Sequence, residues 1–302
     1  MVYKNGFAYG VYGIGIRSFL PLPQLLSYEG RIDAIIRRGR IKCPSRLLKA
    51  QLNCIATKKG DFYFFCKRGG VFCIRNGNEI IVDTVHGADE KLLQAALVGP
   101  CLAFLLYQRG YLVLHAGVVE VNRKAIAFAG AKGWGKSTLV AALHARGYKV
   151  VADDIAAITV NGDKPKVWPG FPQIRLWPSS VRALGQSSEK MPTLHSRCEK
   201  RVHHLSQRFS STPLPLKRIY ILAKSNTQEI KPLRSQKAFI ELVRHSYGSY
   251  VMQHSKNPSH FFQCSNIANR IPVRCLQRGR SLSKLPQFVA MVEKDIKKHA
   301  KN

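Results

Sequence analysis

The segment Gly130–Ser137 constrains the fold of this chain more than any other part of the sequence. It reads Gly-Ala-Lys-Gly-Trp-Gly-Lys-Ser and fits the pattern G-x-x-x-x-G-K-[ST] at every fixed position. The apolar run 125–129 before it predicts a buried strand, and residues 137–146 after it predict a helix closed by Gly147. Such a strand–loop–helix unit wraps backbone N–H groups around a polyphosphate. A glycine-rich turn that binds nothing is the alternative.

The pattern assigns chemical roles to its last residues. Lys136 places a positive charge at the β- and γ-phosphates of a bound ATP, and the hydroxyl of Ser137 is a ligand for Mg²⁺. Thr138, on the first helical turn, is positioned to support the α-phosphate. The predicted nucleotide-binding residues are Gly130, Ala131, Lys132, Gly133, Trp134, Gly135, Lys136, Ser137 and Thr138.

A β-hairpin is predicted directly before the loop. Residues 118–121 and 124–129 read as strands, and Asn122-Arg123 forms the short turn between them. The more common phosphate-loop proteins reach this position through a helical crossover between parallel strands. An antiparallel hairpin here therefore predicts an α/β fold with a mixed sheet.

The sequence divides into a strand-rich N-terminal region, 1–100, and a nucleotide-binding domain, 101–302. In the first part, Asn76-Gly77 between two apolar segments predicts a hairpin, and Asp89 is a candidate cap for a core helix that ends near Gln108. In the second part, further strands are expected at 149–152, 155–160, 166–168, 217–223 and 271–276, helices at 235–247, 258–269 and 285–298, and a mobile loop at 185–215.

Two acidic residues and one histidine are candidates for the reacting groups. Asp153 and Asp154 end a predicted strand one helix after the phosphate loop, and the ends of strands carry the groups that face the nucleotide in such sheets. One carboxylate can take a proton from an attacking hydroxyl while the other holds the metal. His115 also ends a strand and precedes the small residues Ala116-Gly117. An acidic turn and a structural histidine are the alternatives.

Together these residues resemble the HPr kinase/phosphorylase family, serine kinases whose nucleotide fold is related to that of phosphoenolpyruvate carboxykinases. The similar stretch runs from His115-Ala116-Gly117 through the phosphate loop to Gly147-Tyr148 and Asp153-Asp154. It covers about forty residues closely, and segments such as 175–178 and 274–285 look like a shorter branch that includes lasso-peptide tailoring kinases.

The resemblance implies that Asp153 is the base that deprotonates a serine, that Asp154 assists with Mg²⁺, and that His115 and Lys136 flank the transferred phosphoryl group. It implies ATP as donor and a serine of a peptide or small protein, such as a lasso precursor, as acceptor. It also makes a homo-oligomer plausible. The family's glycine-rich segment with a metal-binding glutamate has no counterpart in 165–215, which puts HPr itself and phosphorolysis in doubt.

The chain is strongly basic, with 48 Lys and Arg against 17 Asp and Glu and a net charge of +31. This charge favours anionic partners, and Arg175, Arg278 and Arg280 are candidates for phosphate or acidic-substrate contacts. Basic residues in 185–215, Lys200 among them, are candidates for closing over a peptide. A nucleotide-dependent nucleic-acid-binding protein and a non-catalytic ATP-binding subunit stay open as alternatives.

The eight cysteines show no C-x-x-C pair and no zinc-binding spacing, and the first residues do not form a signal peptide. We therefore expect reduced, mostly buried thiols in a cytoplasmic protein. The apolar run 92–107 is broken by Gly99-Pro100, so a core helix is favoured over membrane insertion.

Overall fold

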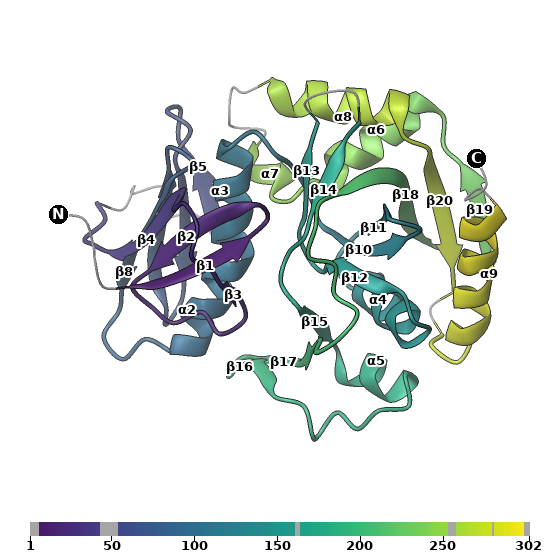
Figure 1. Cartoon of the computed structure of the whole chain (residues 1–302), viewed down its shortest axis with the longest axis horizontal. Coiled ribbons are helices and arrows are strands. Elements are labelled where there is room, and N and C mark those ends of the chain that lie inside the picture. Colours follow the sequence, from purple (N-terminus) through teal and green to yellow (C-terminus); the bar gives the residue numbers. More distant parts are fainter. Residues whose placement is uncertain (1–5, 43–53, 161–163, 253–257, 280, 299–302) are drawn as a thin grey trace.

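The computed structural model describes residues 6–42, 54–160, 164–252, 258–279 and 281–298. Within these ranges the chain has a mixed α/β architecture with two large sheets and one small one. Figure 1 shows the N-terminal sheet at the left and the second sheet at the right, with the small sheet below them. The expected α/β class with a mixed sheet is confirmed.

The N-terminal sheet has the strand order β3-β1-β2-β4-β8-β7-β6-β5. Neighbouring strands are antiparallel except for the parallel pairs β2–β4 and β4–β8. Its strands are β1 (Phe7–Val11), β2 (Ile14–Ser18), β3 (Leu26–Ser27), β4 (Ala34–Arg38), β5 (Cys54–Ala56), β6 (Phe62–Cys66), β7 (Gly70–Arg75) and β8 (Glu79–Thr84).

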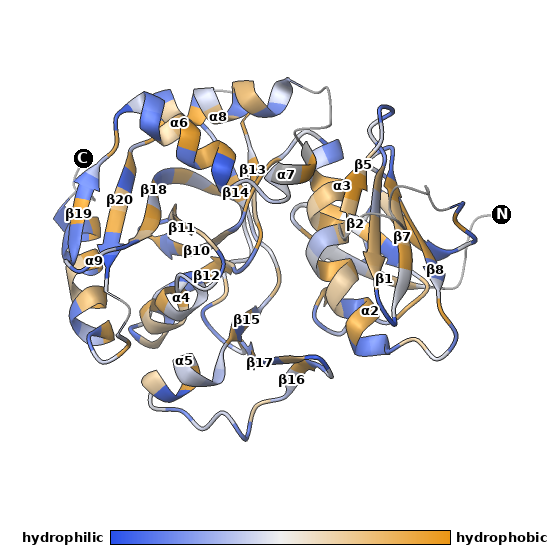
Figure 2. Ribbon diagram, turned by 180° about the vertical axis from the view of Figure 1, so that it is seen from behind, coloured by the Kyte–Doolittle hydropathy of each residue, from blue (hydrophilic) through white to orange (hydrophobic). Residues whose placement is uncertain are grey.

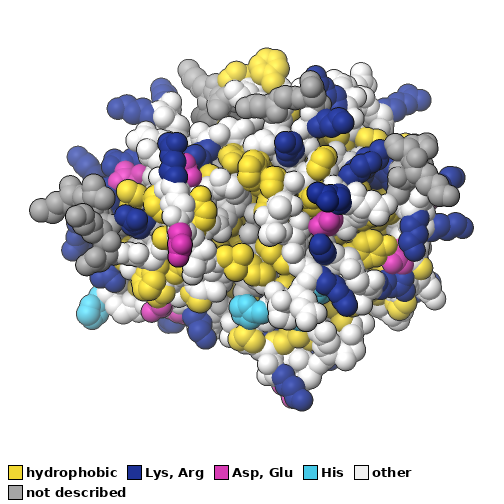
Figure 3. All heavy atoms as spheres, in the orientation of Figure 1, with side chains coloured by type: hydrophobic (Ala, Val, Ile, Leu, Met, Phe, Trp, Pro, Cys, Tyr) yellow, Lys and Arg dark blue, Asp and Glu magenta, His cyan; other side chains and the backbone are white. Residues whose placement is uncertain are grey.

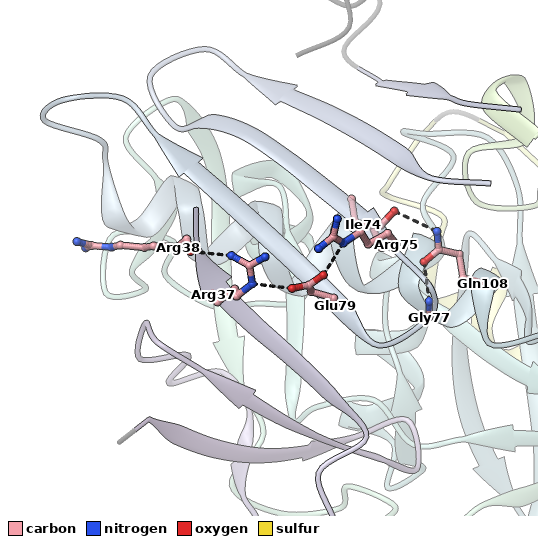
Figure 4. Close-up of polar contacts among 7 residues, drawn as sticks. All are labelled: Arg37, Arg38, Ile74, Arg75, Gly77, Glu79 and Gln108. Carbon is pink, nitrogen blue, oxygen red and sulfur yellow. Dashed lines mark hydrogen bonds and ion pairs between the residues drawn. The ribbon is translucent and has the colours of Figure 1, made fainter. Parts of the chain in front are cut away.

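The predicted hairpin turn joins β7 to β8. Asn76 and Gly77 both have positive φ, 55° and 64°, and they lie in a tight three-residue loop between the paired residues Arg75 and Glu79. Gln108 fixes this turn from the neighbouring helix: its Oε1 accepts from Gly77 N at 3.0 Å and its Nε2 donates to Ile74 O at 3.0 Å (Figure 4). In the same view Glu79 accepts from both Arg37 and Arg75, which ties β4, β7 and β8 together.

One long apolar helical segment covers this sheet. It consists of α2 (Glu90–Ala96), the π-helical turn η1 (Leu97–Cys101) and α3 (Leu102–Gln108), and the side chain of Asp89 accepts from Leu92 N as the expected N-cap. The segment is long and apolar enough to cross a membrane, yet most of it is buried within the fold. Its side chains share one continuous core with the N-terminal sheet as far as Tyr107, the helical and strand segments coloured orange in Figure 2. The expected core helix is confirmed.

The second sheet has the order β12-β10-β11-β18-β14-β13-β9, with β20 beside β18 and β19 beside β20. The hairpin β10–β11 is antiparallel as predicted, whereas β11–β18 and β18–β20 are parallel. Its strands are β9 (Leu112–Leu114), β10 (Ala116–Val121), β11 (Lys124–Ala129), β12 (Lys149–Ala152), β13 (Ala156–Thr159), β14 (Lys166–Trp168), β18 (Leu214–Lys224), β19 (Glu229–Pro232) and β20 (Val273–Arg278).

Helices cover both faces of this sheet. Along β11, Ala125, Ala127 and Ala129 pack toward α6 and α8, while Ile126 and Phe128 pack toward α4 and α9, as the period of two in a strand requires. The helices are α4 (Lys136–Ala145), α6 (Ser235–Arg244), α7 (Ser249–Met252), α8 (Ser259–Arg270) and α9 (Leu285–Lys298). The predicted helices at 235–247, 258–269 and 285–298 are confirmed with small shifts of their ends.

The predicted mobile loop at 185–215 is wrong for much of its length. Strands β16 (Thr193–His195) and β17 (Cys198–His204) pair with β15 (Gln173–Leu176) in a three-stranded sheet, next to the short helix α5 (Pro178–Ala183). The segment is polar because this sheet buries little of it, and its pairing partner lies outside the segment. A reading of local composition therefore missed the strands.

Candidate active site

The phosphate loop lies between β11 and α4, and glycines give it its shape. Gly130, Gly133 and Gly135 have φ angles of 155°, 80° and 90°, which side chains rarely tolerate. A Cβ at Gly130 would lie 3.1 Å from the Cβ of Leu222, so this glycine also lets the loop rest on β18. Helix α4 begins at Lys136, with its free N–H groups directed at the loop.

Lys136 is buried, with 6% of its surface exposed. Its Nζ donates to Gly130 O at 2.8 Å and to Ala131 O at 3.1 Å, which holds the ammonium across the loop. Burial lowers the pKa of Lys136 to about 8, and the negative charges of Asp154 and Asp153 oppose that fall. The group is thus a cation at neutral pH that gains from the approach of phosphate oxygens.

Asp153 follows β12 and is almost fully buried. Its Oδ2 accepts from Arg175 N at 3.1 Å, while its buried Oδ1 has no hydrogen-bond partner in the part of the chain that the structure describes. Burial raises the pKa of the Asp153 carboxyl, and the neighbouring charge of Asp154 raises it further. Gly117 makes room for this group, because a Cβ there would lie 3.3 Å from Oδ1 and 2.6 Å from Val140 Cγ2.

Asp154 adopts the left-handed conformation with φ 73°, which turns its side chain away from that of Asp153. Its carboxylate lies 3.3 Å from His115 Nδ1 and 3.6 Å from Arg175 Nη1. Burial alone would raise the pKa of Asp154, but its electrostatic interactions with His115, Arg175, Lys200 and Lys136 outweigh burial and hold the pKa below its ordinary value. The two adjacent aspartates are therefore tuned in opposite directions.

His115 follows β9, and its backbone N–H donates to His245 O at 2.9 Å. Burial lowers the pKa of His115 to about 4, against the opposing effect of Asp154. At neutral pH the imidazole is uncharged, so it acts as a hydrogen-bonding group and adds no fixed charge to the site.

Ser137 and Thr138 face different neighbours. A side-chain hydrogen bond from Ser137 lowers the pKa of Asp153 and links the loop to the aspartate pair. Thr138 Oγ1 lies 2.8 Å from Ser180 Oγ, and both residues are buried, so this pair joins α4 to α5.

A cleft with a volume of about 500 Å³ is lined by His115, Lys136, Ser137, Thr138 and Asp154, whereas Asp153 is not part of its lining. The phosphate loop and the start of α4 form one wall, and residues of β15, α5 and β17 form the other. Arg278 closes one end: its Nη1 is 2.4 Å from where a Cβ of Gly135 would stand, and this atom is buried without a partner among the described residues. Arg280 lies outside the described residues.

Three residues of the site carried little or no signal in the sequence. Lys200 was only one of several basic residues in an expected loop, yet its charge acts on His115, Lys136 and both aspartates. Tyr12 reaches the site from the turn between β1 and β2, and Tyr247 lines the cleft from the segment after α6. Tyr12 has a positive φ and precedes Gly13, which marks an unusual turn in the structure. The sequence alone does not reveal this angle.

Comparison with known proteins does not assign this chain to a family. No model of a known protein family matches the sequence, and no curated protein matches it. Among solved structures, the HPr(Ser) kinase/phosphatase from Coxiella burnetii is similar over 62% of this chain and 92% of that chain. The identity is 11% and the TM-score is 0.33, a likeness too distant to carry an argument about this chain.

Proposed function

We propose that this protein is an ATP- and Mg²⁺-dependent kinase that transfers the γ-phosphoryl group to a serine hydroxyl of a peptide or small protein. The observation that carries the proposal is that Lys136, Asp154 and His115 line one cleft beside the phosphate loop, while Asp153 is buried next to them and accepts from the backbone of Arg175, another residue of the lining. The resemblance of these positions to the HPr kinase/phosphorylase pattern supports the same reaction.

The opposite pKa shifts of Asp153 and Asp154 suit the two carboxyl groups to different roles. Asp153, with its raised pKa and unpartnered oxygen, is suited to take a proton from the attacking hydroxyl. Asp154, with its lowered pKa, stays anionic throughout. Environments that push the pKa values of neighbouring titratable groups apart are typical of sites that need an acid or base beside a fixed charge.

The remaining groups position and neutralise phosphate. Lys136 and the N–H groups of the loop would bind the β- and γ-phosphates, and His115 would donate or accept a hydrogen bond beside them. In phosphoryl transfer such positioning and charge stabilisation supply most of the rate enhancement.

The donor set fits Mg²⁺. Ser137 supplies a hydroxyl and Asp154 supplies carboxylate oxygens, both from the lining of the cleft, and hard oxygen ligands are those that Mg²⁺ prefers. Ser137 and Asp154 would hold the ion, which when bound would neutralise charge on the phosphates.

Nucleic-acid binding remains a candidate only on the basis of net charge. On the face shown in Figure 3, Lys and Arg are spread over the surface and do not gather in a single stripe. A stripe or groove of basic residues is the usual footprint of a nucleic-acid-binding protein. Steeply salt-dependent binding of DNA or RNA would favour this alternative.

The test is incubation of the protein with labelled ATP, Mg²⁺ and a serine peptide library, followed by detection of phosphoserine. We expect Lys136→Met to lose ATP binding, and Asp153→Asn to retain ATP binding but lose transfer. ATP binding by the wild-type protein with no transfer to any acceptor would instead support a non-catalytic ATP-binding subunit. Full transfer by Asp153→Asn would remove Asp153 from the role of base.

A further inference from the structure

The cleft has a second wall that the chemistry of phosphoryl transfer does not use. It consists of Trp177, Leu194, Cys198 and Lys200, which come from the end of β15, from β16 and from β17. We call these four residues the acceptor wall. Because the phosphate loop forms the opposite wall, a group bound here would face the donor phosphates.

Strand alternation selects which residues of β17 reach the cleft. Cys198 and Lys200 line it, whereas Glu199 and Arg201 do not, as expected when successive side chains point to opposite faces of a strand. The wall therefore presents a cation and leaves the adjacent acid, Glu199, exposed to solvent on the other side.

Lys200 has no ion-pair or hydrogen-bond partner within the ranges that the structure describes. Its charge acts on Asp153 and Asp154, but Asp154 is already engaged by His115 and Arg175. An ammonium in a cleft without its own counter-ion attracts an anionic ligand. The bound anion must lie beside Asp153 and Asp154 without contact to their carboxylates, because like charges repel each other.

Trp177 gives the wall an apolar contact surface. Its side chain is 40% exposed, which is unusual for a tryptophan, and its ring lies 5.8 Å from Lys200 Nζ. Tryptophan is among the residues most enriched where binding energy is concentrated in protein interfaces, and a cation near the face of its ring adds a favourable electrostatic contact.

We infer that the acceptor wall binds a peptide that carries an aspartate or glutamate side chain close to the serine to be phosphorylated. Trp177 packs against the peptide, and Lys200 pairs with the side-chain carboxylate. The inference rests on the proposed function for the serine, but binding of the acidic peptide itself does not require transfer. Acidic peptides are therefore the substrate class that we assign to this cleft.

The test compares fluorescently labelled peptides that share one serine in a neutral background. One set carries glutamate near the serine, a second carries lysine there and a third carries neither, and all have an amidated C-terminus. Binding is followed by anisotropy in the presence of a non-hydrolysable ATP analogue and Mg²⁺. A neutral peptide with a free C-terminus tests a terminal carboxylate as the alternative anion.

The wild-type protein should bind the glutamate peptide about 10- to 100-fold more tightly than the neutral one, the range expected for one charge-assisted contact. Lys200→Met should abolish this preference and Lys200→Glu should reverse it toward the lysine peptide, while Lys200→Arg keeps it. Trp177→Ala should weaken binding of the glutamate and the neutral peptide alike. Lys190→Met removes an exposed lysine that does not line the cleft and should leave the preference unchanged.

A glutamate preference that survives Lys200→Met, or a preference shown only for the free C-terminus, would overturn the inference. Failure of the proposed function looks different: the glutamate preference and its dependence on Lys200 would persist, but no phosphoserine would form with ATP. Equal binding of all the amidated peptides by the wild type would reject the acidic acceptor even if transfer occurs.

Discussion

Replacement of Asp153 by asparagine should stabilise the protein while it abolishes transfer. The carboxyl group is almost fully buried, and burial together with Asp154 raises its pKa. Each unit by which the folded pKa exceeds the unfolded one costs about 1.4 kcal/mol of stability once the group is ionised. Asparagine avoids this cost, and its carbonyl oxygen can still accept from Arg175 N, which bonds Oδ2 at 3.1 Å in the wild type.

The asparagine variant should therefore be more stable than the wild type at neutral pH and should melt at a higher temperature. Loss of the base should slow transfer by about 100- to 10,000-fold. Differential scanning fluorimetry and urea denaturation measure the first quantity, and phosphoserine formation measures the second.

The pH dependence of stability shows whether the gain from Asp153→Asn comes from the buried charge. Because the folded state binds the proton of Asp153 more tightly than the unfolded state does, the penalty is absent well below the ordinary pKa of 3.8 and complete above the raised folded pKa. The advantage of Asp153→Asn should thus grow as pH rises through this window. An equal gain at every pH would contradict an origin in the buried charge.

Asp154→Asn is the matched control, since asparagine also tolerates the positive φ of this position. Asp154 has a lowered pKa, so its contribution to stability is present above 3.8 and lost as pH falls through the folded pKa. Removal of its charge leaves Arg175 unpaired and should cost about 1 to 3 kcal/mol at neutral pH. A destabilised Asp153→Asn, or a stabilised Asp154→Asn, would refute the opposite tuning of the pair.

Four further predictions test the loop and two buried tyrosines of the N-terminal region. ATP affinity should fall as pH rises through about 8, where Lys136 loses its proton, and Lys136→Met should bind weakly with no such step; calorimetry across pH decides. Gly133→Ala adds a methyl in open space at φ 80° and should cost about 1 to 2 kcal/mol; Gly135→Ala, at φ 90°, should cost a similar amount, because the Arg278 guanidinium that it meets is the flexible end of a side chain and can move, and it should weaken ATP binding further; a much larger loss for Gly135→Ala in denaturation would show that this guanidinium is fixed. Tyr9→Phe should cost about 1 to 3 kcal/mol, because its hydroxyl accepts a buried backbone N–H at 2.8 Å. Tyr12→Phe should leave stability unchanged or raise it, since that buried hydroxyl has no partner among the described residues, and a loss of stability would reveal one.

The sequence predicted the elements whose signals are local. The phosphate loop, the hairpin before it and the turn at Asn76-Gly77 depend on glycine, short-range alternation and turn chemistry, all contained within a few residues. The cap at Asp89 is equally local. Each was placed correctly because the physical cause lies next to the residue it affects.

The sequence also named the groups that meet in the cleft. Lys136, Asp153, Asp154 and His115 were selected by their positions at the ends of strands and at the start of a helix, and the fold brings them to one cleft or into contact with its lining. What the sequence could not assign was their ionisation, because the two adjacent aspartates are identical in composition and differ only in what surrounds them.

Only the tertiary structure decided which wall faces the loop and how the aspartates are tuned. Strands β15 and β17 pair although they lie about thirty residues apart in the sequence. Without β15 as its partner, the segment 185–215 has the composition of a loop. That pairing brings Lys200 and Trp177 to the cleft and the backbone of Arg175 to Asp153. Burial and charge act through space, so the sequence alone predicted a loop of the phosphate-binding pattern with two nearby carboxylates, and the fold determined the surroundings of each carboxylate.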